Sequence, residues 1–358
     1  MNMVKEDIVI AGAGLLGRLL AWRLLLGGRR VTLFDAGALE PSPAAAHVAA
    51  GMIAPLSEAA ATERKIYDMG MASLPLWKKW IAQLNAAAGG EGEGGVFFQN
   101  TGSLAVAHPG DSGDLAQFEQ DLRLRLGGEE KNFRRIAQEE LRRLEPDIAP
   151  HFSRAILLAK EANVDNRALL AALLAQIRAL GGRCAAHMPV TVNDGTVMVN
   201  GEKLRCRWTV DCRGFGAAGD DQNLRGVRGE VLRVRCKEVR LRRPLRLMHP
   251  RYQLYIAPRP GGRFVVGATE IESADRSPLS VQSALELCSA LYTVNPAFAE
   301  ARIEEAGVGL RPAFLDNLPR VRLRPGFAAA NGLYRHGFLV APVVVEEIAR
   351  HIAAGEKA

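Results

Sequence analysis

Hydrophobic and polar positions follow two different periods along this chain, and together they predict an α/β protein. Short apolar runs bounded by turn residues predict strands at 7–11 and 31–34, with a helix between them. The segment 163–166 predicts the start of another helix, because an Asp precedes an apolar run there. Apolar residues at helical spacing predict helices at 61–88, 114–126, 137–144, 167–174 and 280–291.

Strands are predicted more densely in the second half of the chain. In the first half, the runs 96–98 and 102–107 predict a hairpin, and a Gly/Glu-rich segment at 89–95 predicts a linker before it. Further strands are predicted at 183–193, 196–200, 205–211, 230–235, 252–258, 264–268 and 326–330.

The first predicted strand runs into Gly12-x-Gly14-x-x-Gly17, and the second ends on Asp35. In this pattern the first glycine permits a tight turn, and the second lets the backbone approach a pyrophosphate at a helix N-terminus. The third glycine lets the helix pack against the strand. An acid such as Asp35 accepts hydrogen bonds from a ribose 2′-OH. The spacing therefore predicts a dinucleotide site, and Asp35 argues against the 2′-phosphate of NADP.

Composition narrows the class of protein. The 358 residues, 48% of them hydrophobic, suffice for one large domain or two interleaved ones. The 46 Lys and Arg against 39 Asp and Glu give a formal charge of +7. The arginines are scattered, which fits solvated surfaces, with a nucleic-acid surface as the alternative.

The spacing of the cysteines and the length of the apolar runs indicate the cellular compartment of the protein. Five dispersed cysteines lack metal-ligand spacing, so we expect reduced thiols and no metal. We expect neither a secretion leader nor a transmembrane segment, and therefore a cytoplasmic protein.

Residues 41–52 are rich in Pro and Ala. Small residues let the backbone approach a bulky ligand closely, although a plain loop has the same composition. Residues 211–216 form a second glycine-rich turn after a predicted strand.

Five motifs occur in order along nearly the whole chain. They are Gly12-x-Gly14-x-x-Gly17 with Asp35; Ala49-Ala50-Gly51-Met52; Val164-Asp165; Tyr255-Ile256-Ala257-Pro258-Arg259 followed by Val265-Val266-Gly267-Ala268-Thr269; and Gly309-Leu310-Arg311-Pro312 with Tyr334-Arg335-His336-Gly337. With these motifs the chain resembles the D-amino-acid oxidase superfamily of FAD enzymes. Within that superfamily it is most similar to the glycine oxidase branch used in thiamine biosynthesis.

This resemblance implies a fold and a division of the chain. The implied architecture is a Rossmann-like FAD-binding domain interleaved with an antiparallel-sheet α+β substrate domain. The FAD-binding domain takes residues 1–85, 151–225 and 306–358, and the substrate domain takes 86–150 and 226–305.

The resemblance also implies which residues bind FAD. Leu15 and Leu16 would lie over the pyrophosphate, residues 50–52 would approach the flavin, and residues 333–339 would wrap the isoalloxazine end. The implied cofactor residues are Gly12, Gly14, Leu15, Leu16, Gly17, Asp35, Ala36, Ala50, Gly51, Met52, Val190, Leu333, Tyr334, Arg335, His336, Gly337, Phe338 and Leu339.

By the same resemblance, Arg311 would clamp a substrate carboxylate, with Tyr255 beside it and Arg335 in the same pocket. A guanidinium presents a planar fork that matches a carboxylate. Each residue also has a structural alternative. Arg311 could be a surface cation, Tyr255 could fill the core, and Arg335 could bond loop carbonyls. His336 and His249 favour structural roles, and the sequence shows no convincing catalytic base.

Three departures from the family's pattern bear on the cofactor. Asp35 stands where Glu is usual, and Ala45 and Ala46 stand where Ser or Thr commonly touches phosphate. Some relatives bind flavin covalently through a Cys shortly after the Arg311 region. This chain has Ala313-Phe314-Leu315 there, so we expect noncovalent FAD.

The resemblance implies oxidative deamination of glycine or another small amino acid, with oxygen as acceptor and hydrogen peroxide as product. The imine would then be usable for thiazole assembly, and the enzyme would be a homo-oligomer. Three alternatives stay open. One is an FAD dehydrogenase with another acceptor, and one is a cofactor-binding scaffold without turnover, in which Arg311 and Tyr255 would be structural. The third is an FAD-bearing tRNA-modification protein, which would need a continuous Lys/Arg patch beside the flavin.

Overall fold

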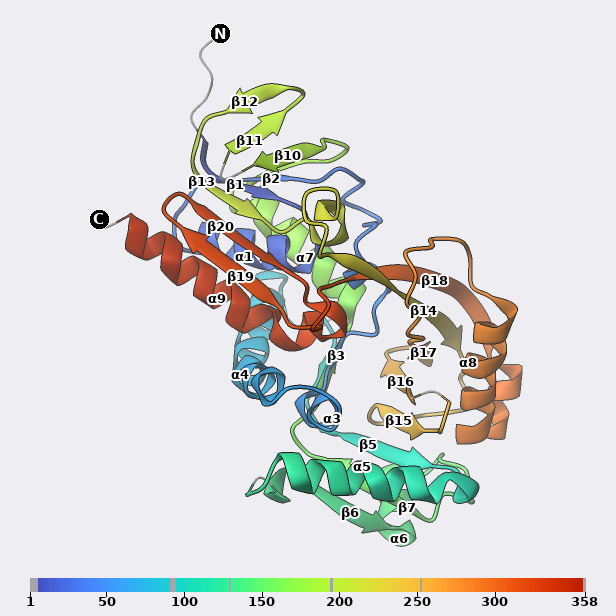
Figure 1. The fold of residues 1–358 in the computed structure, drawn as a ribbon. Helices are drawn as coiled ribbons and strands as arrows, with labels where there is room; N and C mark the ends of the chain where they lie inside the picture. The colour runs from blue at the N-terminus through green and yellow to red at the C-terminus, as the bar shows by residue number, and fades with distance from the viewer. Residues whose placement is uncertain (1–5, 91–94, 129, 194–195, 252, 357–358) are drawn as a thin grey trace.

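The structure is a computed structural model that describes residues 6–90, 95–128, 130–193, 196–251 and 253–356. Residues 91–94 of the expected linker, and Tyr252 at the start of an expected strand, lie outside the described residues. Two large sheets organise the chain (Figure 1): long helices cover one face of the first, and helices lie against both faces of the second.

The first large sheet contains the predicted dinucleotide turn. Its six strands follow the order β19-β20-β13-β1-β2-β9, with β19 antiparallel and the other neighbours parallel. Their bounds are β1 (Glu6–Ala11), β2 (Val31–Phe34), β9 (Arg183–Ala185), β13 (Cys206–Asp211), β19 (Arg320–Arg324) and β20 (Phe327–Asn331).

Alternation along β1 explains why this sheet is covered on both faces. Ile8 and Ile10 pack into a large core with the helices, whereas Val9, Ala11 and Phe34 pack against a three-stranded sheet. The helices are α1 (Leu15–Leu26), α4 (Arg64–Ala87), α7 (Asn166–Ala179) and α9 (Gly337–Gly355), and the small sheet is β10 (Val190–Asn193), β11 (Thr196–Val199) and β12 (Glu202–Leu204).

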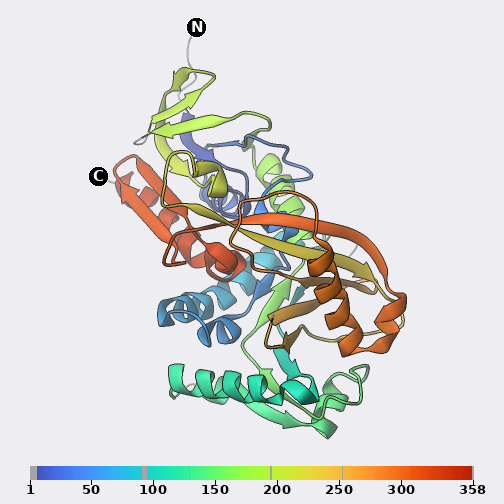
Figure 2. The same ribbon diagram turned by 45° about the vertical axis from the view of Figure 1, so that its right-hand side comes forward.

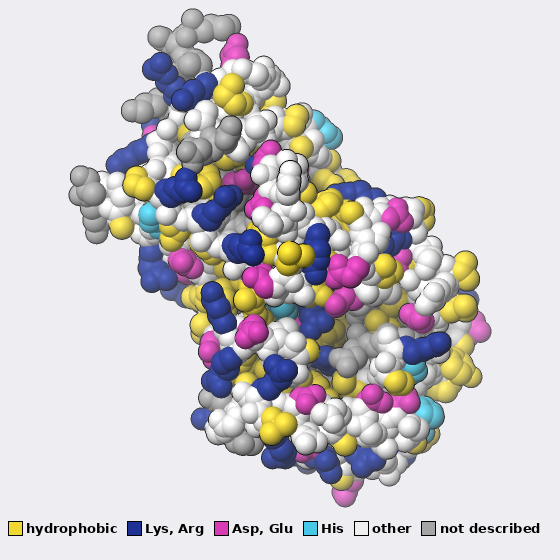
Figure 3. Space-filling model, in the orientation of Figure 1, with side chains coloured by type: hydrophobic (Ala, Val, Ile, Leu, Met, Phe, Trp, Pro, Cys, Tyr) yellow, Lys and Arg dark blue, Asp and Glu magenta, His cyan; other side chains and the backbone are white. Residues whose placement is uncertain are grey.

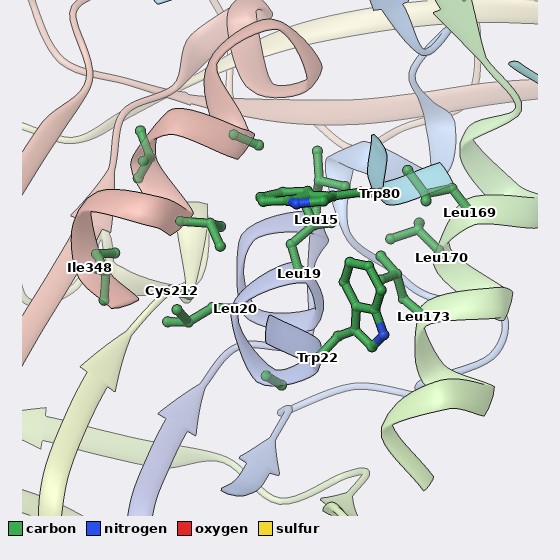
Figure 4. Packing of buried hydrophobic residues seen from close by; sticks show 14 of the residues in the cluster. Leu15, Leu19, Leu20, Trp22, Trp80, Leu169, Leu170, Leu173, Cys212 and Ile348 are labelled. Carbon is green, nitrogen blue, oxygen red and sulfur yellow. The ribbon is translucent and has the colours of Figure 1, made fainter. Parts of the chain in front are cut away.

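Aromatic packing fills the core between the helices. Trp22 of α1 and Trp80 of α4 meet edge to face with ring centroids 6.1 Å apart, and Trp77 lies 6.3 Å from Trp80. Figure 4 shows Trp22 and Trp80 among leucines from α1 and α7. This core fixes the N-terminus of α1, where the glycine turn lies.

The second large sheet has eight strands in the order β18-β14-β17-β16-β15-β5-β7-β6. All neighbours are antiparallel except β15 and β5. The bounds are β5 (Ser103–Ala107), β6 (Phe133–Ala137), β7 (Arg154–Leu158), β14 (Arg225–Arg235), β15 (Leu245–Met248), β16 (Gln253–Arg259), β17 (Arg263–Gly267) and β18 (Arg302–Ala313). The helices beside it are α5 (Ser112–Arg125), α6 (Gln138–Leu144) and α8 (Val281–Val294).

Short elements join the two large sheets. The strands β3 (Met52–Ile53), β8 (Ala162–Val164) and β4 (Phe98–Gln99) form a small sheet, and α2 (Ala45–Val48) and α3 (Pro55–Ala59) flank β3. The long strands β14 and β18 reach from the region of the six-stranded sheet to α8 (Figure 2).

Two local predictions are wrong. The runs 96–98 and 102–107 do not form a hairpin, because β4 pairs with β8 while β5 pairs with β7 and β15. The stretch 183–193 is two strands in different sheets, since the chain turns at His187 with φ 53°. In contrast, Asp165 caps α7 as predicted, accepting hydrogen bonds from the N–H groups of Arg167 and Ala168.

The segments that build each sheet bear on the proposed domains. The six-stranded sheet draws its strands from residues 1–85, 151–225 and 306–358. However, β7 joins the eight-stranded sheet although it follows residue 150, and β18 crosses the boundary at 305–306. The division into interleaved FAD-binding and substrate domains stays our proposal. Among the residues that the structure describes, no helix combines the length and apolar character needed to cross a membrane.

Candidate active site

A cavity of about 570 Å³ extends from the glycine turn of β1 to the eight-stranded sheet. Its size is typical of small-molecule and cofactor sites. It brings together most of the residues that the sequence singled out. These are Gly12, Gly14, Leu15, Leu16, Asp35, Ala36, Ala50, Gly51, Met52, Val190, Tyr255, Arg311, Leu333, Tyr334, Arg335, Gly337, Phe338 and Leu339.

Gly17 and His336 do not line the cavity. A Cβ on Gly17 would lie 1.9 Å from the carbonyl oxygen of Gly12, so Gly17 lets α1 pack against the turn. Gly12 itself has φ +98°, and a Cβ there would lie 2.5 Å from the carbonyl oxygen of Cys212. Both glycines therefore shape the turn by close backbone packing.

Asp35 holds the same turn from the end of β2. Its Oδ2 accepts the N–H of Ala13 at 2.7 Å, and its Oδ1 accepts the N–H of Gly37 at 2.8 Å. A carboxylate has about four acceptor positions, so these bonds leave acceptor capacity toward the cavity. The sequence placed Asp35 at a ribose, and the structure adds this role in the turn.

Three arginines to which the sequence analysis gave no role lie behind the cavity wall; Arg18 and Arg259 are buried, and Arg233 is half-buried. Arg18 is 1% exposed and donates to the carbonyl oxygens of Ala13, Leu39 and Leu170. Arg233 donates to the carbonyl of His47, and Arg259 to that of Ala50. None of the three guanidiniums forms an ion pair with a carboxylate in the described part of the chain.

Carboxylates such as Asp35 and Asp165 act on these arginines from a distance, but none of the described carboxylates is bonded to them. Burial lowers the pKa of Arg18, and it lowers the pKa of Arg233 and of Arg259 to about 10. Because the ordinary pKa of arginine lies far above 7, the three guanidiniums are nevertheless cationic at neutral pH. An isolated buried charge is costly, which favours an anionic ligand in the adjoining cavity.

The arginines also orient peptide groups around the cavity. In a trans peptide the N–H points away from the C=O. Because Arg18 and Arg259 bind the carbonyls of Ala13 and Ala50 on the buried side, the N–H groups of Gly14 and Gly51 face the cavity. Neither N–H has an acceptor among the described residues. Unpaired N–H groups and nearby cations fit a dinucleotide with two phosphates.

At the opposite end of the cavity, the half-buried guanidinium of Arg311 donates only to backbone carbonyls. Its Nη1 lies 3.1 Å from Arg228 O and its Nη2 lies 3.0 Å from Thr269 O. Within the described ranges it forms no ion pair with a carboxylate. Burial lowers its pKa, an effect that the charge of Glu270 partly opposes. Arg311 therefore presents a desolvated positive charge to the cavity.

Tyr255 lies beside a second arginine, Arg246, which the sequence analysis missed. The Tyr255 hydroxyl is 3.3 Å from Arg246 Nη1, which also donates to Ser57 O at 2.9 Å. Burial raises the pKa of Tyr255, so its hydroxyl stays protonated and can donate to a ligand. A charged residue between Leu245 and Leu247 in an apolar strand was a signal that could have found Arg246.

Arg335 lies in the same cavity but is bound by two carboxylates. Its Nε donates to Glu58 at 2.8 Å and its Nη1 to Glu270 at 3.0 Å. Buried His336 also contacts Glu58, and the Tyr334 hydroxyl bonds Glu270. Although burial opposes ionisation, these partners hold the pKa of both carboxyls below the ordinary value. Neither acid is thus a strong base at neutral pH.

Known proteins resemble this chain in sequence over nearly its whole length. The family model described as "DAO: FAD dependent oxidoreductase" matches residues 7–351. A "Putative thiamine biosynthesis oxidoreductase ThiO" from Rhizobium etli is 39% identical over 346 residues, which cover 96% of either protein. A glycine oxidase from Bacillus licheniformis is 26% identical over 361 residues, covering 96% of this chain and 92% of the relative.

Solved structures share the fold. Glycine oxidase from Bacillus cereus matches with a TM-score of 0.83 at 20% identity, covering 98% of both chains. Iminodiacetate oxidase from Chelativorans matches with a TM-score of 0.80 at 22% identity, covering 97% of this chain and 95% of the other. The family match over residues 7–351 confirms the resemblance drawn from the motifs: the chain belongs to the DAO family of FAD-dependent oxidoreductases.

Proposed function

We propose that this protein is an FAD-dependent oxidase of glycine or another small amino acid. The observation that carries the proposal is the Arg311 guanidinium, which lines the cavity and, among the described residues, is bonded to backbone carbonyls alone. The names of the relatives support it, since they include glycine oxidases and a ThiO protein. The family shows an FAD-dependent oxidoreductase; the substrate and the peroxide are our proposal.

FAD would lie along the cavity, with its pyrophosphate at the N–H of Gly14 and its flavin beside Gly51 and Met52. Bound FAD supplies the two-electron acceptor for oxidation of a C–N bond. We infer that FAD is held noncovalently, because Ala313, Phe314 and Leu315 follow the Arg311 motif and offer no thiol.

The protein's part is then to bind and orient the substrate. Arg311 pairs with the carboxylate through two parallel N–H groups, and the Tyr255 hydroxyl adds a directional donor. No described carboxylate near Arg311 has a pKa suited to a base, so the amine reacts in its neutral form. The net reaction oxidises the amino acid by two electrons to an imine, which water hydrolyses to a 2-oxo acid and ammonia. Oxygen as acceptor yields hydrogen peroxide.

Two other functions are distinguished by simple observations. On the face shown in Figure 3, basic and acidic side chains are interspersed, which gives no support to a nucleic-acid surface. A dehydrogenase with another acceptor would reduce a dye without producing peroxide. By similarity to the ThiO relative, we propose that the imine serves thiazole assembly in thiamine biosynthesis.

A panel of small amino acids tests the proposal. We expect the purified yellow protein to produce peroxide with glycine or another small amino acid, in stoichiometric amount with oxygen consumed. Flavin reduction by the panel without peroxide would support the dehydrogenase instead. An unreduced flavin with every amino acid would contradict both enzymes.

A further inference from the structure

The acids beside Arg335 differ in how they are held. Glu58 has a side chain only 13% exposed and bonds both Arg335 and buried His336. The Glu270 side chain is 44% exposed and lies in the loop that follows β17. Both acids line the cavity, but Glu58 is the more buried and is held by two partners from the chain, whereas Glu270 is the more open of the two and closes the other side of Arg335.

The charged side chains at the Arg311 end of the cavity determine which anionic groups a ligand can place there. Arg335 is engaged by two carboxylates, while Arg311 pairs with none of the described acids. Of these two arginines, Arg311 is the one that can pair with a substrate carboxylate, while Arg246, which also lines the cavity, donates to the Ser57 carbonyl beside the Tyr255 hydroxyl. A second anionic group near Arg335 would meet the carboxylate of Glu270, and like charges at close range repel each other.

We propose that Glu270 is a specificity-determining residue, which keeps Arg335 from binding a second anionic group of the substrate. The site then selects amino acids with one carboxylate against those that carry a second carboxylate or phosphonate. This inference rests on the proposed function, in which Arg311 takes the first carboxylate.

A single substitution separates the charge of Glu270 from its shape. Glu270→Gln keeps the side-chain volume and an oxygen that can accept the Tyr334 hydroxyl. It removes the negative charge, so Nη1 of Arg335 becomes available to an anion. Because Glu58 still holds Nε of Arg335, we expect the guanidinium to keep its place.

The test compares acetate with malonate, which carries a second carboxylate on the same small frame. Each is titrated into the FAD-loaded protein at about pH 8, where both are fully ionised, and binding is followed by flavin absorbance. In Glu270→Gln we expect malonate affinity to rise at least about tenfold, the effect of one charge-assisted hydrogen bond. Acetate affinity should change by less than about threefold.

Glu272→Gln is the matched control. Glu272 lies two residues further along the same loop, pairs with Arg225 and does not line the cavity. The Glu272→Gln substitution also removes one negative charge, and we expect neither the malonate affinity nor the acetate affinity to change. Unchanged malonate affinity in Glu270→Gln would overturn the inference, as would an equal gain for acetate or a gain in the control.

The failure of this inference is distinguishable from that of the proposed function. Wild-type protein that binds neither acetate nor malonate would remove the carboxylate site itself. Wild-type protein that binds acetate, with no gain of malonate affinity in Glu270→Gln, would remove only the role of Glu270.

Discussion

Gly229 and Arg311 are diagonal neighbours in the β14–β18 ladder, and the guanidinium of Arg311 lies directly over the Gly229 backbone. Gly229 pairs with Gly309, two residues before Arg311 on the same face of β18. A Cβ added to Gly229 would lie 2.5 Å from the guanidinium carbon. Gly229 therefore makes the space that lets Arg311 face the cavity.

The contact between Gly229 and Arg311 predicts how one added methyl group changes the affinity for a carboxylate. In Gly229→Ala the Arg311 side chain must move, and we expect the affinity for a small carboxylate to fall by about tenfold or more, the loss of one charge-assisted hydrogen bond. FAD should stay bound. Gly219→Ala is the control, since a Cβ there meets nothing within 4 Å. Unchanged carboxylate affinity in Gly229→Ala would contradict the placement of Arg311.

Gly14 gives a prediction for the cofactor. A Cβ there would lie 3.5 Å from the Cβ of Ala44, which also lines the cavity, so larger side chains would occupy it. We expect Gly14→Leu to fold but to purify without FAD, measured as the ratio of flavin to protein absorbance. Gly113→Leu places the same side chain in the first turn of exposed α5, where space is open, and should retain FAD. Full FAD content in Gly14→Leu would contradict the placement of the cofactor against the glycine turn.

The mode of flavin attachment is tested by precipitation. With no cysteine in residues 313–315, we expect acid or heat to release all the flavin into the supernatant as intact FAD. The measurement is chromatography of the supernatant and absorbance of the redissolved pellet. A yellow pellet would contradict noncovalent binding.

Glu161 predicts how stability depends on pH. It is fully buried, and its carboxyl accepts the N–H of Ser57 and bonds the Ser103 hydroxyl. Burial, against these hydrogen bonds, raises its pKa to about 7. The folded protein therefore holds a proton that the unfolded chain releases near its ordinary value, so stability falls as pH rises through this window and is constant above it.

Glu161→Gln removes this titration and keeps an acceptor for Ser57. We expect its melting temperature to exceed that of wild type at pH 8 and to approach it near pH 5, with Glu63→Gln, an exposed acid, as control. A pKa raised from 4.5 to about 7 corresponds to a difference in stability of roughly 3–4 kcal/mol at most. Equal pH profiles for Glu161→Gln and wild type would show that Glu161 does not titrate in this range.

The sequence revealed those parts of the fold and site that depend on short spacings. The turn from Gly12 to Gly17 and the cap at Asp165 each involve neighbours along the chain, so local pattern predicts them. The hairpin prediction at 96–107 failed because strand pairing is decided by partners far away, here β8 and β15. Hydrophobic pattern predicts a strand but not its neighbour.

The partners of Arg335 were outside the reach of sequence reasoning for the same reason. Its two carboxylates, Glu58 and Glu270, lie 277 and 65 residues away along the chain. A motif placed Arg335 in the pocket, but only the folded structure shows that its charge is neutralised. Arg18 was not singled out, and Arg259 was quoted in a motif without a role, because nothing in their local sequence shows which backbone carbonyls they bind.

Arg311 is the residue on which the proposed carboxylate site depends most. Wild type, Arg311→Ala and Arg311→Lys, each loaded with FAD, are titrated with acetate and followed by flavin absorbance. We predict that Arg311→Ala raises the Kd by at least about 30-fold, since a charge-assisted pair in a desolvated pocket contributes about 2–5 kcal/mol. Arg311→Lys should recover only part, because an ammonium cannot reproduce the fork. A Kd within about twofold of wild type in folded, yellow Arg311→Ala would contradict the carboxylate clamp and, with it, the amino-acid oxidase.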